Sequence, residues 1–251
     1  MPVETETRDR VLIVTIRREE KRNAIDDELA AGISAALDRL DDDPELWVGI
    51  LTGTPTVFSA GSDLARTERS SAATARGGEY GLIRRERLKP LIAAVEGPAL
   101  GGGFEIVLAC DLVVAARTAS FGLPEVKRGL VPTCGGLFRT PRALPLNVAK
   151  EMLLTGDRLD PQRAYALGLV NVVAEPGGAL DAALELAARV CSVGPVGARA
   201  SLRALEQTVA ERDELGWSAT TNATDAISNS DDIHEGIAAF FEKREPRWTG
   251  R

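Results

Sequence analysis

The sequence contains a single histidine, His234, among 251 residues. A nucleophile–histidine pair or a histidine-ligated metal site would have to use this one side chain. His234 lies in SDDIHEGIAAFFEKR near the C-terminus, a stretch with a helical pattern, and a surface position is the simpler interpretation. We therefore expect acid–base chemistry in this chain to depend on carboxylates, lysine, tyrosine or cysteine.

Cysteines and long apolar runs are also scarce. Cys110, Cys134 and Cys191 are widely spaced and form no CxxC pair, so we expect reduced thiols in a cytoplasmic protein and no metal site. No stretch of about 20 apolar residues could span a membrane, and the acidic start, MPVETETRDR, is unlike a secretory signal. The net charge of −7 argues against nucleic acid as a partner, because such binding needs a basic face.

The pattern of apolar runs predicts an α/β fold. In the first half of the chain, short apolar strands alternate with helical segments, which is typical of a buried and largely parallel sheet. Asp26 is the expected N-cap of the first helix, which ends before Pro44. The expected strands are residues 10–18, 47–53, 91–97, 111–116 and 169–173, and the expected helices are residues 26–42 and 102–110.

The second half of the chain is mainly helical in pattern. The last of these helices are too few to form a large core of their own, so we expect them to pack on the first half or on a neighbouring subunit. The polar, Gly/Ser-rich residues 66–80 predict a mobile loop that borders a binding site. The helical patterns cover residues 146–156, 161–168, 179–192, 195–210 and 213–243.

Three consecutive glycines in GPALGGGFE, residues 97–105, begin an expected helix, although glycine disfavours helix by about 1 kcal/mol relative to alanine. The stretch lacks the residues of a phosphate-binding P-loop and the spacing of a dinucleotide-binding fingerprint. Two interpretations remain: close packing against a strand, or backbone N–H groups kept bare for a developing oxyanion. The FSAGSD turn, residues 58–63, could supply a second N–H, although alone it is typical of an ordinary turn.

Two glutamates accompany these turns. Glu105 closes the glycine stretch within the first helical turn, where a carboxylate also suits a capping role. Glu125 lies in FGLPEVKRG, an apolar and proline-constrained loop, where it could equally be a surface residue beside Lys127 and Arg128. If burial moves their pKa values apart, the two carboxyl groups could divide general-acid and general-base duties.

Several motifs follow one another along the chain: NAID (23–26), FSAGSDL (58–64), IAAVEGPALGGGFE (92–105), CDLVVAARTASFGLPEVKRGLVP (110–132), GG (135–136), LLTGDRLD (153–160) and GLVNVV (168–173). In this order they resemble the crotonase superfamily, also called the enoyl-CoA hydratase/isomerase family, over nearly the whole chain. Each motif alone is weak, but the ordered set is highly specific. Within the family, GGGFE, LPEVKRGLVP and the EKREPRWTGR tail look similar to the carnitinyl-CoA dehydratase branch.

The change of pattern near residues 175–195 predicts a boundary there, and the resemblance implies a spiral of ββα units over residues 1–190. It also implies a C-terminal helical region, residues 191–251, through which family members form a homotrimer or a dimer of trimers. The predicted fold class is therefore α/β, a crotonase-like spiral with a helical trimerisation region.

The resemblance also implies a site. The oxyanion-hole donors would be the N–H groups of Ser62 and Gly102. Family hydratases use two glutamates, which match Glu105 and Glu125, whereas isomerases and many other branches keep only the second or neither. The resemblance thus implies a hydro-lyase that adds or removes water across the C2=C3 bond of an acyl-CoA thioester.

Coenzyme A takes part in this chemistry as a portion of the substrate, and the resemblance implies no further cofactor. Lys243, from the same chain or from a neighbouring subunit, could meet a CoA phosphate. The positions that match the family's substrate-binding and CoA-binding motifs are Arg22, Ala24, Ala60, Asp63, Leu64 and Lys243.

Departures from the family pattern leave the acyl group open. Ser62 replaces the alanine of many hydratases, Leu123 stands where a polar residue is frequent, and Cys134, expected mainly to pack, replaces a small residue. A carnitine-type acyl group carries a quaternary ammonium, which aromatic faces or an acid would bind. Aromatic residues make up only 4% of the chain, and the candidates for such a site are Trp47, Tyr80, Phe104 and Trp217.

Other activities remain open on the same scaffold. Enoyl-CoA isomerisation, thioester hydrolysis and decarboxylation need at most one glutamate, so the presence of both favours the hydratase or dehydratase. A different class of function is a non-catalytic member that binds CoA esters or RNA. The acidic net charge of −7 argues against RNA, and the paired glutamates argue against an inactive site.

Overall fold

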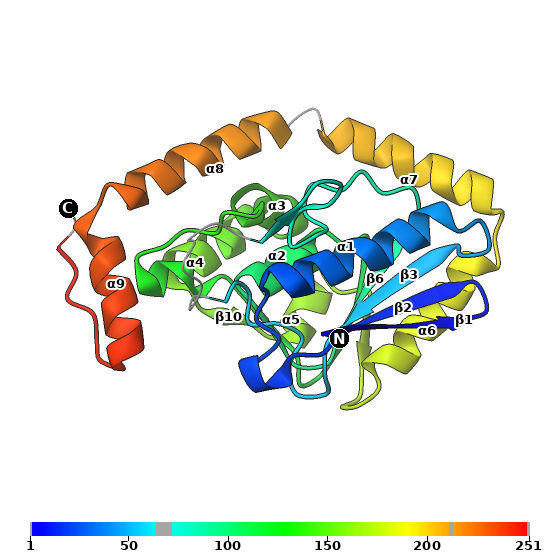
Figure 1. The fold of residues 1–251 in the computed structure, drawn as a ribbon, viewed down its shortest axis with the longest axis horizontal. Coiled ribbons are helices and arrows are strands. Elements are labelled where there is room, and N and C mark those ends of the chain that lie inside the picture. Colours follow the sequence, from blue (N-terminus) through cyan, green and yellow to red (C-terminus); the bar gives the residue numbers. More distant parts are fainter. Residues whose placement is uncertain (1, 64–71, 211–212, 250–251) are drawn as a thin grey trace.

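The computed structural model describes residues 2–63, 72–210 and 213–249 (Figure 1). Its strands are β1 (Val3–Arg8), β2 (Val11–Ile16), β3 (Val48–Thr52), β4 (Ala73–Thr74), β5 (Gly78–Glu79), β6 (Leu91–Val95), β7 (Pro98–Leu100), β8 (Leu112–Ala116), β9 (Ser120–Gly122), β10 (Arg158–Leu159) and β11 (Val172–Ala174). Its helices are η1 (Glu19–Lys21), α1 (Asp27–Asp42), α2 (Gly102–Leu108), η2 (Pro124–Arg128), α3 (Gly136–Ala143), α4 (Leu146–Thr155), α5 (Pro161–Ala166), α6 (Ala179–Cys191), α7 (Pro195–Ala210), α8 (Asp213–Ser228) and α9 (Asp231–Glu242).

A six-stranded sheet in the order β1-β2-β3-β6-β8-β11 forms the centre of the fold. β1 is antiparallel to β2, and the other neighbouring pairs in this sheet are parallel. The α/β class and the largely parallel sheet are therefore confirmed. The pattern of apolar runs missed β1, because Val3 is the only buried residue of that polar strand.

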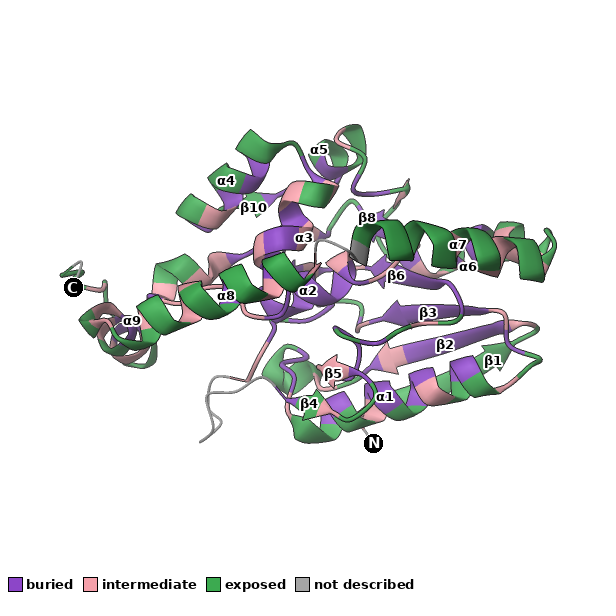
Figure 2. Cartoon of the chain, turned by 90° about the horizontal axis from the view of Figure 1, so that it is seen from above, coloured by how far each residue is buried: buried purple, intermediate pink, exposed green. Residues whose placement is uncertain are grey.

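Both faces of the large sheet are covered. Along β2, Leu12, Val14 and Ile16 belong to the core that includes α1, whereas Val11 and Ile13 pack with α6 on the other face. Every residue of β3 and β6 is buried, which explains why these strands read as continuous apolar runs. Figure 2 shows the buried strands and the single buried stripe along α1.

The chain passes from the large sheet to a second sheet twice, and this brings the two glutamates of interest together. β6 leads into β7 and then α2, and β8 leads into β9 and then η2. β6 and β8 are neighbours in the large sheet, and β7 and β9 are parallel neighbours in the sheet ordered β10-β9-β7. Glu105 on α2 and Glu125 on η2 therefore follow adjacent strands of the same sheet.

The C-terminal helices differ from the prediction in one respect. The stretch 213–243 forms two helices, α8 and α9, which are interrupted at Asn229 and Ser230 because these side chains favour helix ends over helix interiors. Residues 73–79 of the predicted mobile loop form the β4–β5 hairpin, and residues 66–71 lie outside the described part of the chain. In the described ranges, no helix is both long and apolar enough to cross a membrane. The domain division at residue 190 remains a prediction.

A buried ion pair joins the beginnings of β6 and β8. The carboxylate of Asp111 accepts hydrogen bonds from the Arg87 guanidinium at 2.6 and 2.8 Å and from the Leu91 N–H at 2.7 Å. The side chains of Arg87 and Asp111 are only 10% and 8% exposed, so the pair is largely shielded from water.

Asp111→Ala should therefore destabilise the fold by about 3 kcal/mol or more, because it leaves a buried guanidinium without its counter-charge. Denaturant unfolding would measure the loss. Asp157→Ala is the matched control, since the Lys127–Asp157 pair is 52% and 69% exposed and its removal should barely move the midpoint. If both substitutions had equally small effects on stability, the buried Arg87–Asp111 pair would not have the stabilising role described here.

Candidate active site

A buried asparagine fixes the loop before α1 against the loop after β3. The Asn23 side-chain amide donates to the carbonyl oxygens of Val57 at 2.9 Å and Phe58 at 3.1 Å. The Ser59 hydroxyl donates to the Asn23 carbonyl at 2.8 Å. Asn23 is fully buried, with a left-handed φ of 53°. These bonds fix the backbone that leads into the FSAGSD turn.

The next residues of the two loops form a short parallel bridge. The Ile25 N–H donates to the Gly61 carbonyl at 2.8 Å, and the Asp63 N–H donates to the Ile25 carbonyl at 3.1 Å. Ser62 lies between these two partners, so its own N–H is directed away from Ile25. A Cβ at Gly61, where φ is 90°, would lie 2.6 Å from the Gly102 nitrogen, so only glycine permits this approach.

The approach brings the Ser62 turn against the first residue of α2. Neither the Ser62 N–H nor the Gly102 N–H donates a hydrogen bond to another residue in the described ranges. The Gly102 N–H is one of the first N–H groups of a helix, which have no partner within the helix and carry partial positive charge. Two backbone donors from separate loops are what an oxyanion hole needs.

Glu105 lies inside the protein rather than at a helix cap. Glu105 is only 1% exposed. Its Oε1 accepts hydrogen bonds from the N–H groups of Cys134 at 2.7 Å and Gly136 at 2.8 Å. Burial raises the pKa of Glu105 to about 7, although the two backbone N–H groups lower it. The carboxyl group can therefore exchange a proton near neutral pH.

Glu125 lies in the first turn of η2, facing the glycine stretch. Its Oε1 is 3.0 Å from the place where a Cβ on Gly101 would lie, and its buried Oε2 has no hydrogen-bond partner in the described structure. Burial, followed by the charge of Glu105, raises the pKa of Glu125 to about 8. Two carboxyl groups that interact in this way lose their protons in two successive steps.

Two features of this site have no local signal in the sequence. The N–H groups of Cys134 and Gly136 come from a turn some thirty residues after Glu105, and no local pattern marks them as its partners. Cys134, expected mainly to pack, is fully buried and also contributes through its backbone. The phenol of Tyr80 lies beside both backbone donors: its hydroxyl is 2.7 Å from the Ser62 Oγ, and its ring blocks any Cβ on Gly102.

The other predicted substrate-binding residues fall into two places. Arg22, Ala24, Ala60 and Asp63 lie along the paired loops, where the Ala60 N–H donates to the Arg22 carbonyl at 3.0 Å. Ala60 is exposed, Ala24 is buried, and the Asp63 carboxylate lies 2.9 Å from a nitrogen of Arg18. Leu64 lies outside the described residues.

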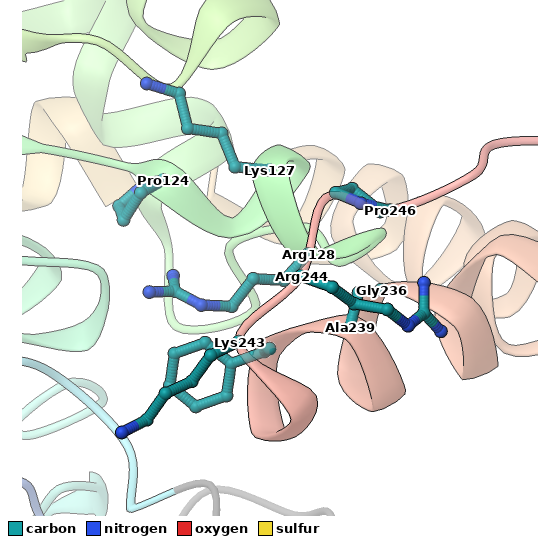
Figure 3. A pocket seen from close by; sticks show the side chains of 9 residues that line it. Pro124, Lys127, Arg128, Gly236, Ala239, Lys243, Arg244 and Pro246 are labelled. Atoms are coloured by element: carbon teal, nitrogen blue, oxygen red, sulfur yellow. The ribbon is translucent and has the colours of Figure 1, made fainter.

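Lys243 belongs to a separate cleft of about 280 Å³ between η2 and α9. Figure 3 shows the residues that line it, which come from η2, from α9 and from the segment that follows α9. Arg244 is held by Glu235 and Lys127 by Asp157, whereas Lys243 forms no ion pair within the described ranges. The cleft is lined by Pro124, Lys127, Arg128, Gly236, Ala239, Phe240, Lys243, Arg244 and Pro246.

The four aromatic candidates do not gather at one place. Trp47 packs under the Arg10 guanidinium, and Trp217 under that of Arg84. The fully buried ring of Phe104 packs against Phe121, with the ring centres 5.5 Å apart. Of the four, only Tyr80 contacts both Ser62 and Gly102, so these residues form no aromatic cage in this structure.

Proteins of one known family resemble this chain along nearly its whole length. The family model for enoyl-CoA hydratase/isomerase matches residues 6–251. Enoyl-CoA hydratase EchA19 from Mycobacterium tuberculosis is 39% identical over 98% of this chain and 96% of its own length. Carnitinyl-CoA dehydratase from Citrobacter koseri is 41% identical over 96% of this chain and 95% of its own length. The solved structure of a carnitinyl-CoA hydratase from Mycobacterium avium superimposes with a TM-score of 0.93 at 39% identity, covering 100% and 99% of the two chains.

These matches confirm the predicted family, its mixed α/β fold with a C-terminal helical region, and the prediction of a hydro-lyase of the enoyl-CoA hydratase type. The chain belongs to the enoyl-CoA hydratase/isomerase family.

Proposed function

We propose that this chain catalyses the reversible addition of water across the C2=C3 bond of a 2-enoyl-CoA thioester, with Glu105 and Glu125 as its acid–base pair. The observation that carries the proposal is the pair of buried carboxyl groups, whose pKa values are raised to about 7 and about 8, close to two backbone N–H groups. Isomerisation and thioester hydrolysis need at most one such carboxyl group, so the pair favours hydration.

The substrate carbonyl oxygen would lie between the N–H groups of Ser62 and Gly102. When water adds at C3, the electrons of the C2=C3 bond move toward the thioester and negative charge develops on that oxygen. Each donor of such a site typically lowers the barrier by roughly 3–4 kcal/mol, because it is already oriented before the charge appears. The absence of other hydrogen bonds to these two N–H groups from the described residues supports this role.

The two glutamates would perform opposite proton transfers. Oε1 of Glu105 is occupied by the Cys134 and Gly136 N–H groups, which leaves Oε2 to take a proton from water as its oxygen bonds to C3. Protonated Glu125 would give its proton to C2. The lower pKa of Glu105 and the higher pKa of Glu125 favour this division near neutral pH. Proton exchange with solvent would then restore both groups.

The remaining predicted residues would bind the CoA portion of the substrate. The loops that contain Arg22, Ala24, Ala60 and Asp63 adjoin Ser62 and would follow the pantetheine and adenine. Leu64 extends the same motif beyond the described residues. The ammonium group of Lys243, which has no ion-pair partner among the described residues, lies in a cleft with Lys127 and Arg128 and suits a CoA phosphate. This chemistry requires no cofactor apart from the CoA of the substrate.

We also propose a homotrimer or a dimer of trimers. Large apolar side chains of α7 and α8 are unusually exposed in the single chain: Val196 is 78%, Leu205 64% and Leu215 75% exposed. Figure 1 shows these two helices running along one side of the molecule, where a neighbouring subunit could cover them. A cytoplasmic location remains a prediction.

A carnitine-type substrate is the second candidate. Relatives named carnitinyl-CoA dehydratase are 41% identical to this chain over 251 aligned residues, which supports it. The dispersal of Trp47, Phe104 and Trp217 gives it no support, because an ammonium group would find no aromatic cage there. A turnover screen that includes crotonyl-CoA, longer enoyl-CoAs and crotonobetainyl-CoA would separate the two.

The proposed pair of glutamates can be tested by substitution. Glu105→Gln and Glu125→Gln should each lower kcat for crotonyl-CoA hydration by about 100- to 10,000-fold, because each removes one proton transfer. Loss of the absorbance of the conjugated thioester measures the rate. Glu185→Gln, at an exposed position of α6, is the control and should keep wild-type activity. Wild-type turnover in Glu105→Gln would remove Glu105 from the mechanism and favour a single-glutamate reaction.

The pH dependence of hydration should reflect the raised pKa values. The base must be ionised, so kcat/KM should rise as pH increases through about 7; the acid must be protonated, so it should fall above about 8. The residual activity of Glu125→Gln should keep the rise and lose the fall, because its remaining carboxyl group acts only as the base. A flat wild-type profile between pH 6 and 9 would contradict the paired roles.

A further inference from the structure

Tyr80 lies at the centre of a hydrogen-bonded group that the proposed mechanism does not use. Its hydroxyl is 2.7 Å from the Ser62 Oγ and lies beside the Cys134 thiol. The thiol in turn lies 3.7 Å from the Thr133 hydroxyl. The phenol also covers the Cα of Gly102, where a Cβ would collide with the ring and its hydroxyl. Tyr80 thus contacts both residues that present the free N–H groups.

The backbone at Tyr80 adopts an unfavourable conformation, and this conformation sets the direction of the ring. Its φ is 57°, in the left-handed region that a bulky residue rarely adopts. The Tyr80 N–H donates to the Ala72 carbonyl at 2.6 Å, which closes the loop around the β4–β5 hairpin, and the side chain is almost fully buried. A strained, buried tyrosine beside two backbone N–H groups that have no acceptor among the described residues indicates a functional constraint on the position of its hydroxyl.

The hydroxyl acts as a fixed hydrogen-bonding group rather than as an acid or base. Burial is the largest cause that raises the pKa of Tyr80 well above its usual value, so the phenol stays protonated at neutral pH. Its one hydrogen can be donated to only one of two neighbours, the Ser62 hydroxyl or the Cys134 thiol, and it accepts from the other. It therefore links the Ser62 turn to the turn whose Cys134 N–H holds Glu105.

We infer that Tyr80 is a positioning residue for the oxyanion hole, whose hydroxyl fixes the Ser62 side chain and thereby the direction of the Ser62 N–H. The inference rests on the proposed function, because it assigns the two N–H groups to a thioester oxygen. It also explains the serine at position 62: alanine there would give the Tyr80 hydroxyl no partner on that turn. Loss of either hydroxyl should loosen the Ser62 turn and leave the bulk of the site intact.

A ligand that forms an enolate tests this role without turnover. A 3-oxoacyl-CoA such as acetoacetyl-CoA loses its C2 proton to solvent to give an absorbing enolate, and an oxyanion hole raises the bound enolate fraction. Tyr80→Phe, which keeps the ring, should lower the enolate ionisation constant of bound ligand by about tenfold, in line with the sensitivity of oriented groups to small displacements. Tyr165→Phe, at the only other tyrosine of the chain, is 53% exposed in the wild type and should change nothing.

A double-mutant cycle distinguishes positioning from general stability. Ser62→Ala should reproduce the Tyr80→Phe loss, and the double variant should lose no more than either single variant, because both remove one hydrogen bond. In hydration assays the loss should fall on kcat, with KM changed less than about twofold. If Tyr80→Phe fails to fold, Ser62→Ala alone supplies the same test.

The outcomes separate this inference from the proposed function. The role of Tyr80 would be overturned if the wild type and Tyr80→Phe stabilised the enolate equally. It would also be overturned if the losses of enolate stabilisation in the two single variants added in the double variant. Either result would leave hydration in place. A wild type that raises the enolate fraction through Tyr80 but hydrates no enoyl-CoA would support the positioning role and remove the hydratase reaction. A wild type that does not raise the enolate fraction would overturn the inference.

Discussion

The close approach of Gly61 to the nitrogen of Gly102 is the contact on which the site depends. It joins two turns that are forty residues apart, and it is possible only because Gly61 has no Cβ and adopts a left-handed φ. The bridge between Ile25 and Ser62 sets the direction of one free N–H, and the start of α2 sets the other. Since α2 also carries Glu105, the same contact fixes the position of the carboxylate relative to both donors.

Burial of two neighbouring carboxyl groups would give the proposed site its chemistry. Water would keep both glutamates ionised at neutral pH, but removal from water, together with the charge of Glu105 acting on Glu125, raises the pKa of both groups. The Cys134 and Gly136 N–H groups offset part of this cost at Glu105, whereas a buried oxygen of Glu125 has no hydrogen-bond partner in the described structure. The two carboxyl groups therefore differ in environment, which in the proposed mechanism would let one hold a proton while the other accepts one.

Much of the fold could be predicted because its signals are local. The apolar runs of β3 and β6 and the Asp26 cap of α1 are visible in a few adjacent residues, and the order of motifs identifies the family. The polar β1 and the three-residue β7 and β9 carry too weak a pattern, and they form because neighbouring strands complete their hydrogen bonds. In the candidate site, Tyr80 and the amide of Asn23 depend on partners distant in the sequence, so no spacing rule could reveal their contacts.

We propose that the N–H groups of Ser62 and Gly102 together polarise a thioester carbonyl. The most direct measurement is the vibrational frequency of an isotope-labelled C=O in a 2-enoyl-CoA bound to the doubly substituted Glu105→Gln/Glu125→Gln protein, in which turnover is suppressed. Two hydrogen bonds in a site removed from water should weaken the C=O bond and lower its frequency below the value in aqueous solution. A bound carbonyl with the same frequency as in water, or a higher one, would contradict the account.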